Sequence, residues 1–307
     1  MAEGARGDPR VRVVVVSHNT RQDLLRCLDA LRRNVTLPLE VSVVDNASHD
    51  GSAEAVRRSF PEARLIESAQ NLGFSRANNL GLRDCRAPYA LILNSDAEVA
   101  PGCVEALCAL LERNPDVGVV GPRTVSGDGT IQVSFGPALA PWAEWRQRRL
   151  VNGVRARAAW ALWKAEQAAA SEHEPDWVSA SCLLARREAL QAVGGFDESF
   201  FLYEEDVDLC LRVRRAGWRV VFTPAAQVVH HLGRSMQTAP ERARLEYQRS
   251  HLRYYRKHNG WLATTALRLV LLGAATLGWL SAIGPGEERR GRRSGHRAVL
   301  RLAGCLR

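Results

Sequence analysis

The sequence predicts an α/β protein with a doubly wound, mostly parallel sheet, and three observations lead to this fold class. Apolar runs rich in valine, isoleucine and leucine alternate with amphipathic helical patterns over residues 11–122, as in successive βαβ units. Several of these runs are continuously apolar, which is typical of strands covered on both faces. The chain has 307 residues and is 46% hydrophobic, so it can bury a large core.

Each element of residues 11–122 is indicated by a local pattern. Four leucines, Leu24, Leu25, Leu28 and Leu31, share one helical face. Asp50 or Ser52 is a plausible cap for the next helix. The predicted order is a strand at 11–19, a helix at 21–34, a strand at 39–48, a helix at 50–60, a strand at 63–68, a helix at 75–85, a strand at 89–99, a helix at 102–113 and a strand at 117–122.

Beyond residue 122 the pattern becomes turn-rich, so short strands and loops are expected before further helices. The face shared by Val207, Cys210, Leu211 and Arg214 predicts a helix that Gly217 ends. The other predicted elements are helices within 142–171, a strand turning into a helix at 176–190, and strands at 218–224 and 226–233. The predicted parts are a disordered N-terminus at 1–10, halves at 11–122 and 123–236, a helical extension at 237–284 and a basic tail at 285–307.

Residues 261–283 form an almost wholly apolar segment in which Arg268 is the only charge. A bilayer span needs about 20 such residues. Trp261 and Trp279 could lie at the two membrane interfaces. The segment therefore predicts either a membrane span or a half-buried helix in the membrane plane, and the alternative is a core helix of a soluble protein.

The formal net charge of +9 suggests an anionic partner, either nucleic acid or an anionic membrane. The basic residues are densest at 289–307, without the interleaved aromatic residues of an RNA-binding surface, so we expect no nucleic-acid binding. The seven cysteines include no CxxC pair, and the first ten residues lack the apolar core of a signal peptide. A reducing, cytoplasmic location follows, at the inner face of a membrane.

Acidic residues follow two of the predicted strands. Asp96 and Glu98 end the strand at 89–99, where ligands bind in parallel sheets, and two acids spaced i, i+2 can both reach a divalent cation. A solvated turn, or an aspartate that caps the helix at 102–113, is the alternative. Asp45 ends the second strand and could accept hydrogen bonds from a base or ribose, although the local sequence alone favours turn chemistry as the explanation.

Two other motifs are weaker signals. Arg76 opens a predicted helix and could meet phosphate, and one histidine of the pair at 230–231 could complete a metal shell. Neither GxGxxG nor GxxxxGK[ST] occurs, which argues against dinucleotide oxidoreductases and P-loop enzymes.

The motifs taken together are more specific than any one of them. In order they are "VVVVSHN", "VVDNASHDGS", "NLGFSRANN", "LILNSDAEV", "WVSASCLLARREAL", "GGFDESFFLYEEDVDLCLRVRRAGW" and "VVHHLGRS". This series resembles the family 2 glycosyltransferases with the GT-A fold, in particular their bacterial rhamnosyltransferase-like branch, over about residues 11–236.

The resemblance implies roles for the residues of both halves. The first half would bind the nucleotide sugar and the second the acceptor, with Mg²⁺ or Mn²⁺ as the cofactor. Asp45 would bind the base, and Glu98 with Asp96 and His230 would hold the metal. The implied nucleotide-sugar contacts are Ser17, Asn19, Asp45, Arg76, Asn78 and Asp96.

The resemblance also gives a role to the four carboxylates at Glu204, Glu205, Asp206 and Asp208. In an inverting transfer one carboxylate takes the proton of the acceptor hydroxyl, and no glycosyl-enzyme intermediate forms. Asp206 would be this base and Glu205 would orient the acceptor, whereas Asp208 is interpreted as a solvated helix acid. The expected acceptor-binding residues are Trp177, Phe201 and Tyr203.

The resemblance thus implies transfer of a sugar, most plausibly L-rhamnose from dTDP-rhamnose, to a lipid-linked or polysaccharide acceptor. Another donor sugar, such as glucose, mannose or galactofuranose, remains an alternative. A non-catalytic nucleotide-binding scaffold is a third possibility, against which the acids at 96, 98, 205 and 206 argue.

Overall fold

A computed structural model describes residues 8–231, 240–282 and 287–305. The described residues form two compact units. The first contains the chain up to Ser199 and resumes at Asp206, and the second contains Phe200–Glu205 together with the C-terminal helices. The predicted disorder of residues 1–10 lies mostly outside the described residues, but Arg10 is held by a backbone hydrogen bond of 2.9 Å from its N–H to the carbonyl of Pro38.

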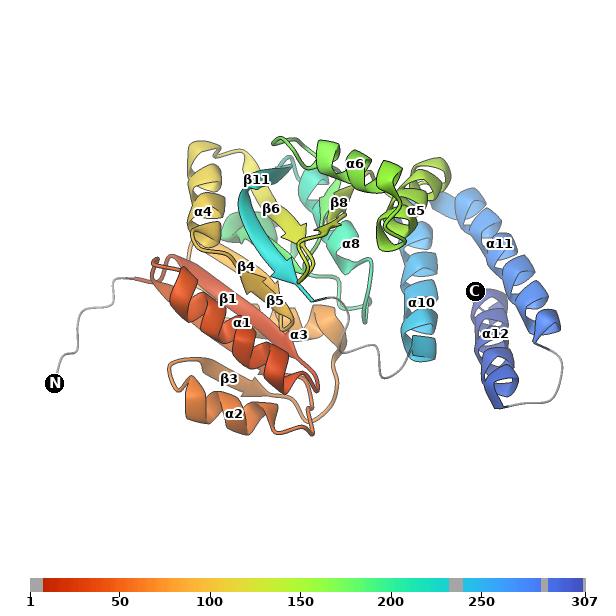
Figure 1. The fold of residues 1–307 in the computed structure, drawn as a ribbon, viewed down its shortest axis with the longest axis horizontal. Helices are drawn as coiled ribbons and strands as arrows, with labels where there is room; N and C mark the ends of the chain where they lie inside the picture. Colours follow the sequence, from red (N-terminus) through yellow and green to blue (C-terminus); the bar gives the residue numbers. More distant parts are fainter. Residues whose placement is uncertain (1–7, 232–239, 283–286, 306–307) are drawn as a thin grey trace. The chain divides into compact units, whose positions relative to one another are not determined.

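The first unit is built on one large mixed sheet (Figure 1). Within the described residues its strand order is β3-β2-β1-β4-β10-β6-β11-β5, and β7 pairs with β6. The strands are β1 (Val11–Ser17), β2 (Leu39–Asp45), β3 (Arg64–Glu67), β4 (Tyr89–Asn94), β5 (Ala97–Val99), β6 (Val117–Val125), β7 (Ile131–Gln132), β10 (Cys182–Arg186) and β11 (Arg219–His230). A separate small pair joins β8 (Phe135–Gly136) to β9 (Trp177–Val178).

The pairing agrees with the predicted parallel sheet in its first part and departs from it later. Strands β3, β2, β1 and β4 are all parallel, as is the β6–β11 pair. Strand β10 enters antiparallel between β4 and β6, and β5 and β7 also join antiparallel. The curled mixed sheet therefore joins the two predicted halves, because β6 crosses their boundary at residue 122.

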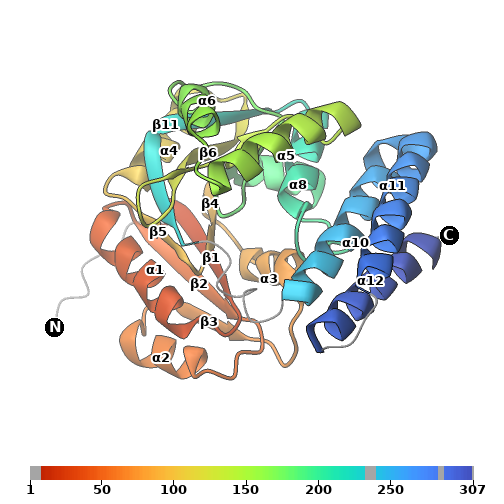
Figure 2. The same cartoon turned by 45° about the vertical axis from the view of Figure 1, so that its right-hand side comes forward.

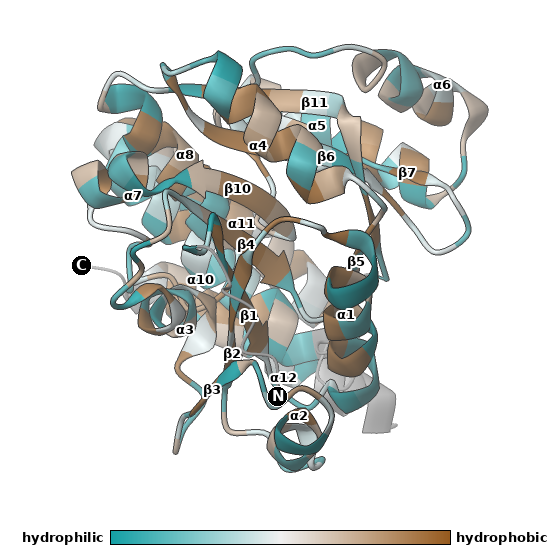
Figure 3. Cartoon of the chain, turned by 90° about the vertical axis from the view of Figure 1, so that its left-hand side faces the viewer, coloured by the Kyte–Doolittle hydropathy of each residue, from teal (hydrophilic) through white to brown (hydrophobic). Residues whose placement is uncertain are grey.

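Helices cover both faces of the sheet. Leucines of α1 (Arg21–Asn34) and α4 (Cys103–Arg113) pack with α2 (Ser52–Ser59) into the core on one face. On the other face the core includes residues of α3 (Gly73–Leu82), α7 (Arg187–Val193) and α8 (Glu205–Arg215), with α5 (Pro141–Arg155) and α6 (Ala159–Ala168). In Figure 3 the central strands are largely brown, the colour of hydrophobic residues. Burial is worth roughly 1.5–3 kcal/mol for each fully buried large apolar side chain.

Helix α3 approaches the sheet closely because it carries a glycine at the contact. A Cβ on Gly81 would lie 2.4 Å from Cγ1 of Val14 on β1. Any side chain at this position would push α3, and the loop before it, away from the ends of the strands.

Three predicted boundaries were wrong for local reasons. The strand expected at 89–99 is interrupted by a turn at Ser95 and Asp96, and the strands expected at 218–224 and 226–233 are one strand with an irregular register. Neither expected side chain caps α2: Gly51 occupies the cap position at φ +78°, while Asp50 accepts hydrogen bonds from the N–H and hydroxyl of Ser52.

The second unit consists of loop 200–205 and three helices that pack on one another: α10 (Pro240–His258), α11 (Gly260–Ser281) and α12 (Glu287–Cys305). Figure 2 shows the three helices from another side. The predicted basic tail is therefore helical over most of its length. By length and composition, α11 is the one helix of the described chain that could cross a membrane.

Candidate functional site

Polar residues gather where β1, β2 and β4 end. Ser17 and Asp45 are register partners at the ends of β1 and β2, and Asn94 at the end of β4 pairs with Val16 of β1. The hydroxyl of Thr20 lies 2.9 Å from the hydroxyls of both Ser17 and Ser95. These short contacts fix the loops after β1 and β4 against each other, so the edge is a preformed polar surface.

Asp45 has an acceptor atom available for a ligand. Its side chain is buried, and Oδ2 accepts a hydrogen bond of 3.2 Å from the N–H of Ser48. Its Oδ1 is also buried and has no hydrogen-bond partner within the described part of the chain. A buried unsatisfied acceptor costs about 1–3 kcal/mol, which a donor on a bound base would recover.

Asn19 joins two loops of the site. Its backbone has φ +55°, its N–H donates to Oγ of Ser48 at 3.0 Å, and its Oδ1 accepts from the N–H of His49 at 2.8 Å. Asn46, which the sequence reasoning missed, acts similarly by accepting from the N–H of Leu72 at 2.7 Å. Both amides therefore fix the loops beside Asp45.

Arg76 and Asn78 lie on α3 but in different surroundings. Arg76 is exposed and pairs with Glu198 at 3.2 Å. Asn78 is buried, donates to the carbonyl of Phe74 at 3.0 Å, and keeps a buried Oδ1 with no hydrogen-bond partner among the described residues. Their predicted nucleotide contacts remain predictions.

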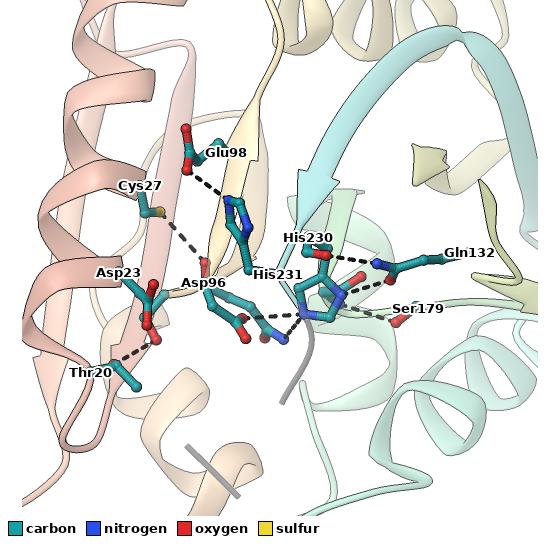
Figure 4. A network of polar contacts seen from close by, with 12 residues as sticks. Thr20, Asp23, Cys27, Asp96, Glu98, Gln132, Ser179, His230 and His231 are labelled. Carbon is teal, nitrogen blue, oxygen red and sulfur yellow. Dashed lines mark hydrogen bonds and ion pairs between the residues drawn. The ribbon is translucent and has the colours of Figure 1, made fainter. Parts of the chain in front are cut away.

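Asp96 and His230 face each other, as Figure 4 shows. Oδ1 of Asp96 lies 3.2 Å from Nε2 of His230, and the amide nitrogen of Asn94 lies 3.3 Å from the same nitrogen. Gln132 holds the histidine on its other side, with its Oε1 at 3.1 Å from Nδ1 and its Nε2 donating to the His230 carbonyl at 2.6 Å. Sequence reasoning missed Asn94 and Gln132.

Glu98 does not join this group, so the predicted three-residue metal shell is not assembled. Its carboxylate contacts Nε2 of His231 at 2.8 Å and Nε of Arg26 at 3.5 Å. Because a turn separates Asp96 from β5, the two acids take different partners. Across the described ranges, no three His, Cys, Asp or Glu side chains form a metal-binding group.

The donor set around Asp96 still fits a divalent cation bound together with a phosphate ligand. A carboxylate and an imidazole are suitable ligands for Mn²⁺, and Mg²⁺ and Mn²⁺ sites commonly take further oxygens from substrate phosphates. Burial, followed by the negative charges of Asp96 and Glu98, raises the pKa of the neighbouring Cys27 thiol well above its ordinary value.

The acids of the second candidate region have distinct surroundings. Asp206, which is half-buried at the start of α8, accepts a hydrogen bond of 3.1 Å from the N–H of Ala180 and one of 2.9 Å from the N–H of Val207. Glu205 is buried. Two backbone donors thus hold the Asp206 carboxylate in one orientation, which is what a positioned base requires.

Asp208 is not the solvated acid that the sequence suggested. Its side chain is 0% exposed and pairs with Nε of Arg212 at 2.7 Å. The same guanidinium donates to the carbonyls of Val193 and Gly195 at 2.9 and 2.8 Å. The pair therefore ties α8 to the end of α7.

We expect Asp208→Asn to destabilise the protein by about 3–5 kcal/mol, because breaking a buried pair leaves an uncompensated charge. The measurement is the free energy of unfolding in urea. Exposed Asp29, paired with Arg33 one helical turn away, offers a matched control, and Asp29→Asn should cost under about 1 kcal/mol. Equal small decreases in the free energy of unfolding for the two variants would show that the Asp208–Arg212 pair does not stabilise the fold.

In the second unit, loop 200–205 packs on α10. Tyr203 and Glu204 have φ of +71° and +65°, and the buried Glu204 carboxylate lies 3.1 Å from Nδ1 of His251. The Tyr203 ring packs edge-on against Tyr247 at 5.7 Å. These contacts hold a strained backbone just before Glu205.

The three predicted acceptor-binding aromatics are divided between the units. Phe201 and Tyr203 belong to the second unit, and the guanidinium of Arg242 lies 6.0 Å from the Phe201 ring. Trp177 lies on β9 in the first unit, where its indole N–H donates to the carbonyl of Pro137 at 2.9 Å. Their predicted role in acceptor binding remains a prediction.

Comparisons with known proteins agree on the fold and family. The family model "Glycosyl transferase family 2" matches residues 12–193. An N-acetylglucosaminyl-diphospho-decaprenol L-rhamnosyltransferase of Mycobacterium tuberculosis is 32% identical over 86% of this chain and 90% of that protein. The O-antigen biosynthesis protein RfbC of Myxococcus xanthus is 29% identical over 84% of this chain and 20% of its own length.

Solved structures support the same fold. The mannosyltransferase PcManGT of Pyrobaculum calidifontis, solved with GDP-Man and Mn²⁺, superposes with a TM-score of 0.57 at 19% identity, covering 96% of this chain and 86% of that one. GalNAc-T7, solved with UDP, GalNAc and Mn²⁺, gives a TM-score of 0.54 at 15% identity, with 72% and 42% covered. The predicted GT-A fold is confirmed.

Proposed function

This chain belongs to glycosyl transferase family 2, and from that premise we propose that it transfers L-rhamnose from dTDP-rhamnose to a hydroxyl of a lipid-linked glycan acceptor. The family makes it a nucleotide-sugar glycosyltransferase, and the relative from Myxococcus xanthus is named for O-antigen biosynthesis. The relative from M. tuberculosis, matched over nearly its whole length, is named for L-rhamnose transfer to a polyprenyl-diphosphate-linked sugar. That match carries the choice of donor and acceptor.

The donor would bind at the ends of β1, β2 and β4. The available Oδ1 of Asp45 is suited to the imide N–H of a thymine or uracil base. Ser17 and Asn19 line the loops beside it, and Arg76 and Asn78 on α3 would meet the ribose or phosphates. The diphosphate would then extend toward Asp96.

Asp96 and His230 would hold a divalent cation against the diphosphate. When bound, Mg²⁺ or Mn²⁺ supplies positive charge that offsets the charge of the leaving nucleoside diphosphate. Asn94 and Gln132 keep the His230 ring in place through the contacts described above, so their replacement would disturb the orientation of the imidazole.

Transfer would proceed in one displacement. The acceptor oxygen forms a bond to the anomeric carbon, the bond from that carbon to the diphosphate oxygen breaks, and the hydroxyl proton passes to Asp206. The backbone N–H groups of Ala180 and Val207 would keep this carboxylate aimed throughout. Glu205 would orient the acceptor, and the aromatic side chain of Trp177 would pack on its sugar.

A donor screen tests this function. Purified chain is mixed with a polyprenyl-diphosphate-linked N-acetylglucosamine acceptor and, in turn, with the nucleotide-linked forms of rhamnose, glucose, mannose and galactofuranose. We expect acceptor-dependent nucleoside diphosphate release to be fastest with dTDP-rhamnose. Faster release with another donor would replace rhamnose, and donor binding without release from any of them would favour a nucleotide-binding scaffold.

The C-terminal helices would hold the enzyme at the cytoplasmic membrane face, with α11 in the membrane plane. Only 6% of the apolar window of α11 is buried. Arg268 in its middle donates to the carbonyls of Ala303 and Gly304, so α12 is fixed along it. A spanning α11 would bring Arg293, Arg297 and Arg301 toward hydrocarbon, at about 2.5–3.5 kcal/mol each at the bilayer centre.

In-plane binding predicts the location of the segment that joins α11 to α12. In inverted inner-membrane vesicles, an epitope inserted after Gly284 should be as accessible to protease as one added before Met1. Because α12 runs back along α11, a spanning α11 would place the inserted epitope on the far side of the membrane. Protection of that epitope alone would therefore contradict the in-plane arrangement.

A further inference from the structure

The helix pair α5–α6 in the first unit presents an unusual number of tryptophans to solvent. Trp142 and Trp145 on α5 are 68% and 51% exposed, and Trp160 and Trp163 on α6 are 48% and 67% exposed. Large apolar side chains rarely gather in this way on a soluble surface that binds nothing. The family function assigns no role to these four rings, which we call the tryptophan surface.

Three of the four rings of the tryptophan surface contact one another or a shared arginine. Trp142 stacks on Trp145 with ring centroids 5.1 Å apart and an interplanar angle of 19°. The guanidinium of Arg149 lies 5.7 Å from the Trp145 ring and 5.5 Å from the Trp160 ring. Arg149 therefore bridges the two helices between aromatic faces.

The inward faces of both helices are firmly packed. Val154 on α5 and Ala161 and Ala165 on α6 are buried in the core beneath the sheet. The helices touch so closely that a Cβ on Gly153 would lie 2.6 Å from Cβ of Ala161. The tryptophans are thus exposed on a fixed scaffold, because the other side of each helix already supplies the core contacts.

The charge of the helix pair is strongly positive. Residues 141–168 contain six basic and two acidic side chains, a difference of +4. Both acids are engaged in ion pairs, Glu144 with Arg148 at 2.5 Å and Glu166 with Arg123 at 2.6 Å. The basic residues are Arg146, Arg148, Arg149, Arg155, Arg157 and Lys164.

From this combination we infer that the tryptophan surface binds the headgroup region of an anionic lipid bilayer. Tryptophan is enriched where membranes meet water, and arginine is attracted to anionic headgroups. The surface lies on the unit that carries Asp45 and Asp96, so it is a membrane contact separate from α11 and α12. It brings the donor-binding unit itself to the bilayer where a lipid-linked acceptor resides, a consequence that rests on the proposed function.

The test is flotation of the full-length chain with vesicles of phosphatidylcholine alone or mixed with phosphatidylglycerol. The wild-type chain should bind the mixed vesicles preferentially. Trp142→Ala with Trp145→Ala should weaken this partition by at least about tenfold, and Arg149→Gln by about fivefold. The melting temperature should fall by no more than a few degrees, because the replaced side chains are exposed and lose only ring-stacking and cation–π contacts.

Arg58→Gln, at an exposed arginine on α2, is the matched charge control and should bind as the wild type does. Leu269→Glu tests α11 separately, and the vesicle binding that it loses should add to the binding lost by the tryptophan variant.

Unchanged vesicle binding by the double tryptophan variant would overturn the inference. Equal binding of the wild type to neutral and to anionic vesicles would also overturn it. Nucleoside diphosphate release with a short water-soluble acceptor should survive these changes, which separates this inference from the proposed function.

Discussion

Asp206→Asn should lower kcat for sugar transfer by about 10²–10⁴-fold, the usual cost of losing a positioned base. Asparagine keeps the size of the side chain, and its one carbonyl oxygen can still accept from the N–H of either Ala180 or Val207, which donate to different oxygens of Asp206. It cannot take the proton of the acceptor hydroxyl. Donor affinity should stay near that of the wild type, because the proposed nucleotide contacts lie within residues 17–98.

The measurements are acceptor-dependent nucleoside diphosphate release and donor affinity by calorimetry. Glu205→Gln should raise KM for the acceptor more than it lowers kcat, since its proposed role is orientation. Asp208→Asn should be recognised by its lower stability, because Asp208 is buried against Arg212. If Asp206→Asn turns over normally while Glu205→Gln is inactive, the base is the neighbouring glutamate.

Asp96→Ala should abolish transfer or sharply raise the metal concentration that transfer requires, and EDTA should inactivate the wild type. The physical reason is that Asp96 supplies the one carboxylate that faces His230 in the described part of the site. Calorimetry with Mn²⁺ and the nucleoside diphosphate gives a readout apart from activity, and the metal-dependent part of nucleotide affinity should disappear.

Glu98→Gln is the matched control, because Glu98 contacts Arg26 and His231 and stands outside the Asp96–His230 pair. It should retain most of the metal-dependent nucleotide binding. Full activity in EDTA together with a normal Asp96→Ala enzyme would remove the metal from the mechanism. Loss of metal binding in Glu98→Gln alone would restore the three-residue shell that the sequence suggested.

The fold was largely predictable because its signals are local. Apolar runs such as Val11–Ser17 and the leucine face of α1 indicate type and position of elements without any knowledge of neighbours. Strand direction is not encoded in this way. The apolar composition of Cys182–Arg186 predicts a strand but not its orientation. That this strand, β10, lies antiparallel between β4 and β6 could therefore not be deduced.

The site was predicted less completely, for two reasons. The prediction that Asp96 and Glu98 reach one cation assumed an unbroken strand, in which side chains two residues apart lie on the same face. The turn at Ser95 and Asp96 interrupts that strand, so the two side chains take different partners. Gln132 reaches His230 across 98 positions of the chain, a contact that no local pattern contains. For Asp208, by contrast, the sequence held a usable signal: Arg212 stands four residues later on the same helix, the spacing of an ion pair.

The anomeric configuration of the product tests the central claim most directly. In the proposed mechanism the acceptor oxygen displaces the nucleoside diphosphate in one step, while Asp206 takes the proton of the acceptor hydroxyl. Nuclear magnetic resonance of the product formed from a donor of known anomeric configuration should then show the opposite configuration at the transferred sugar. Retention of the donor's configuration would contradict the single displacement, and with it the role assigned to Asp206.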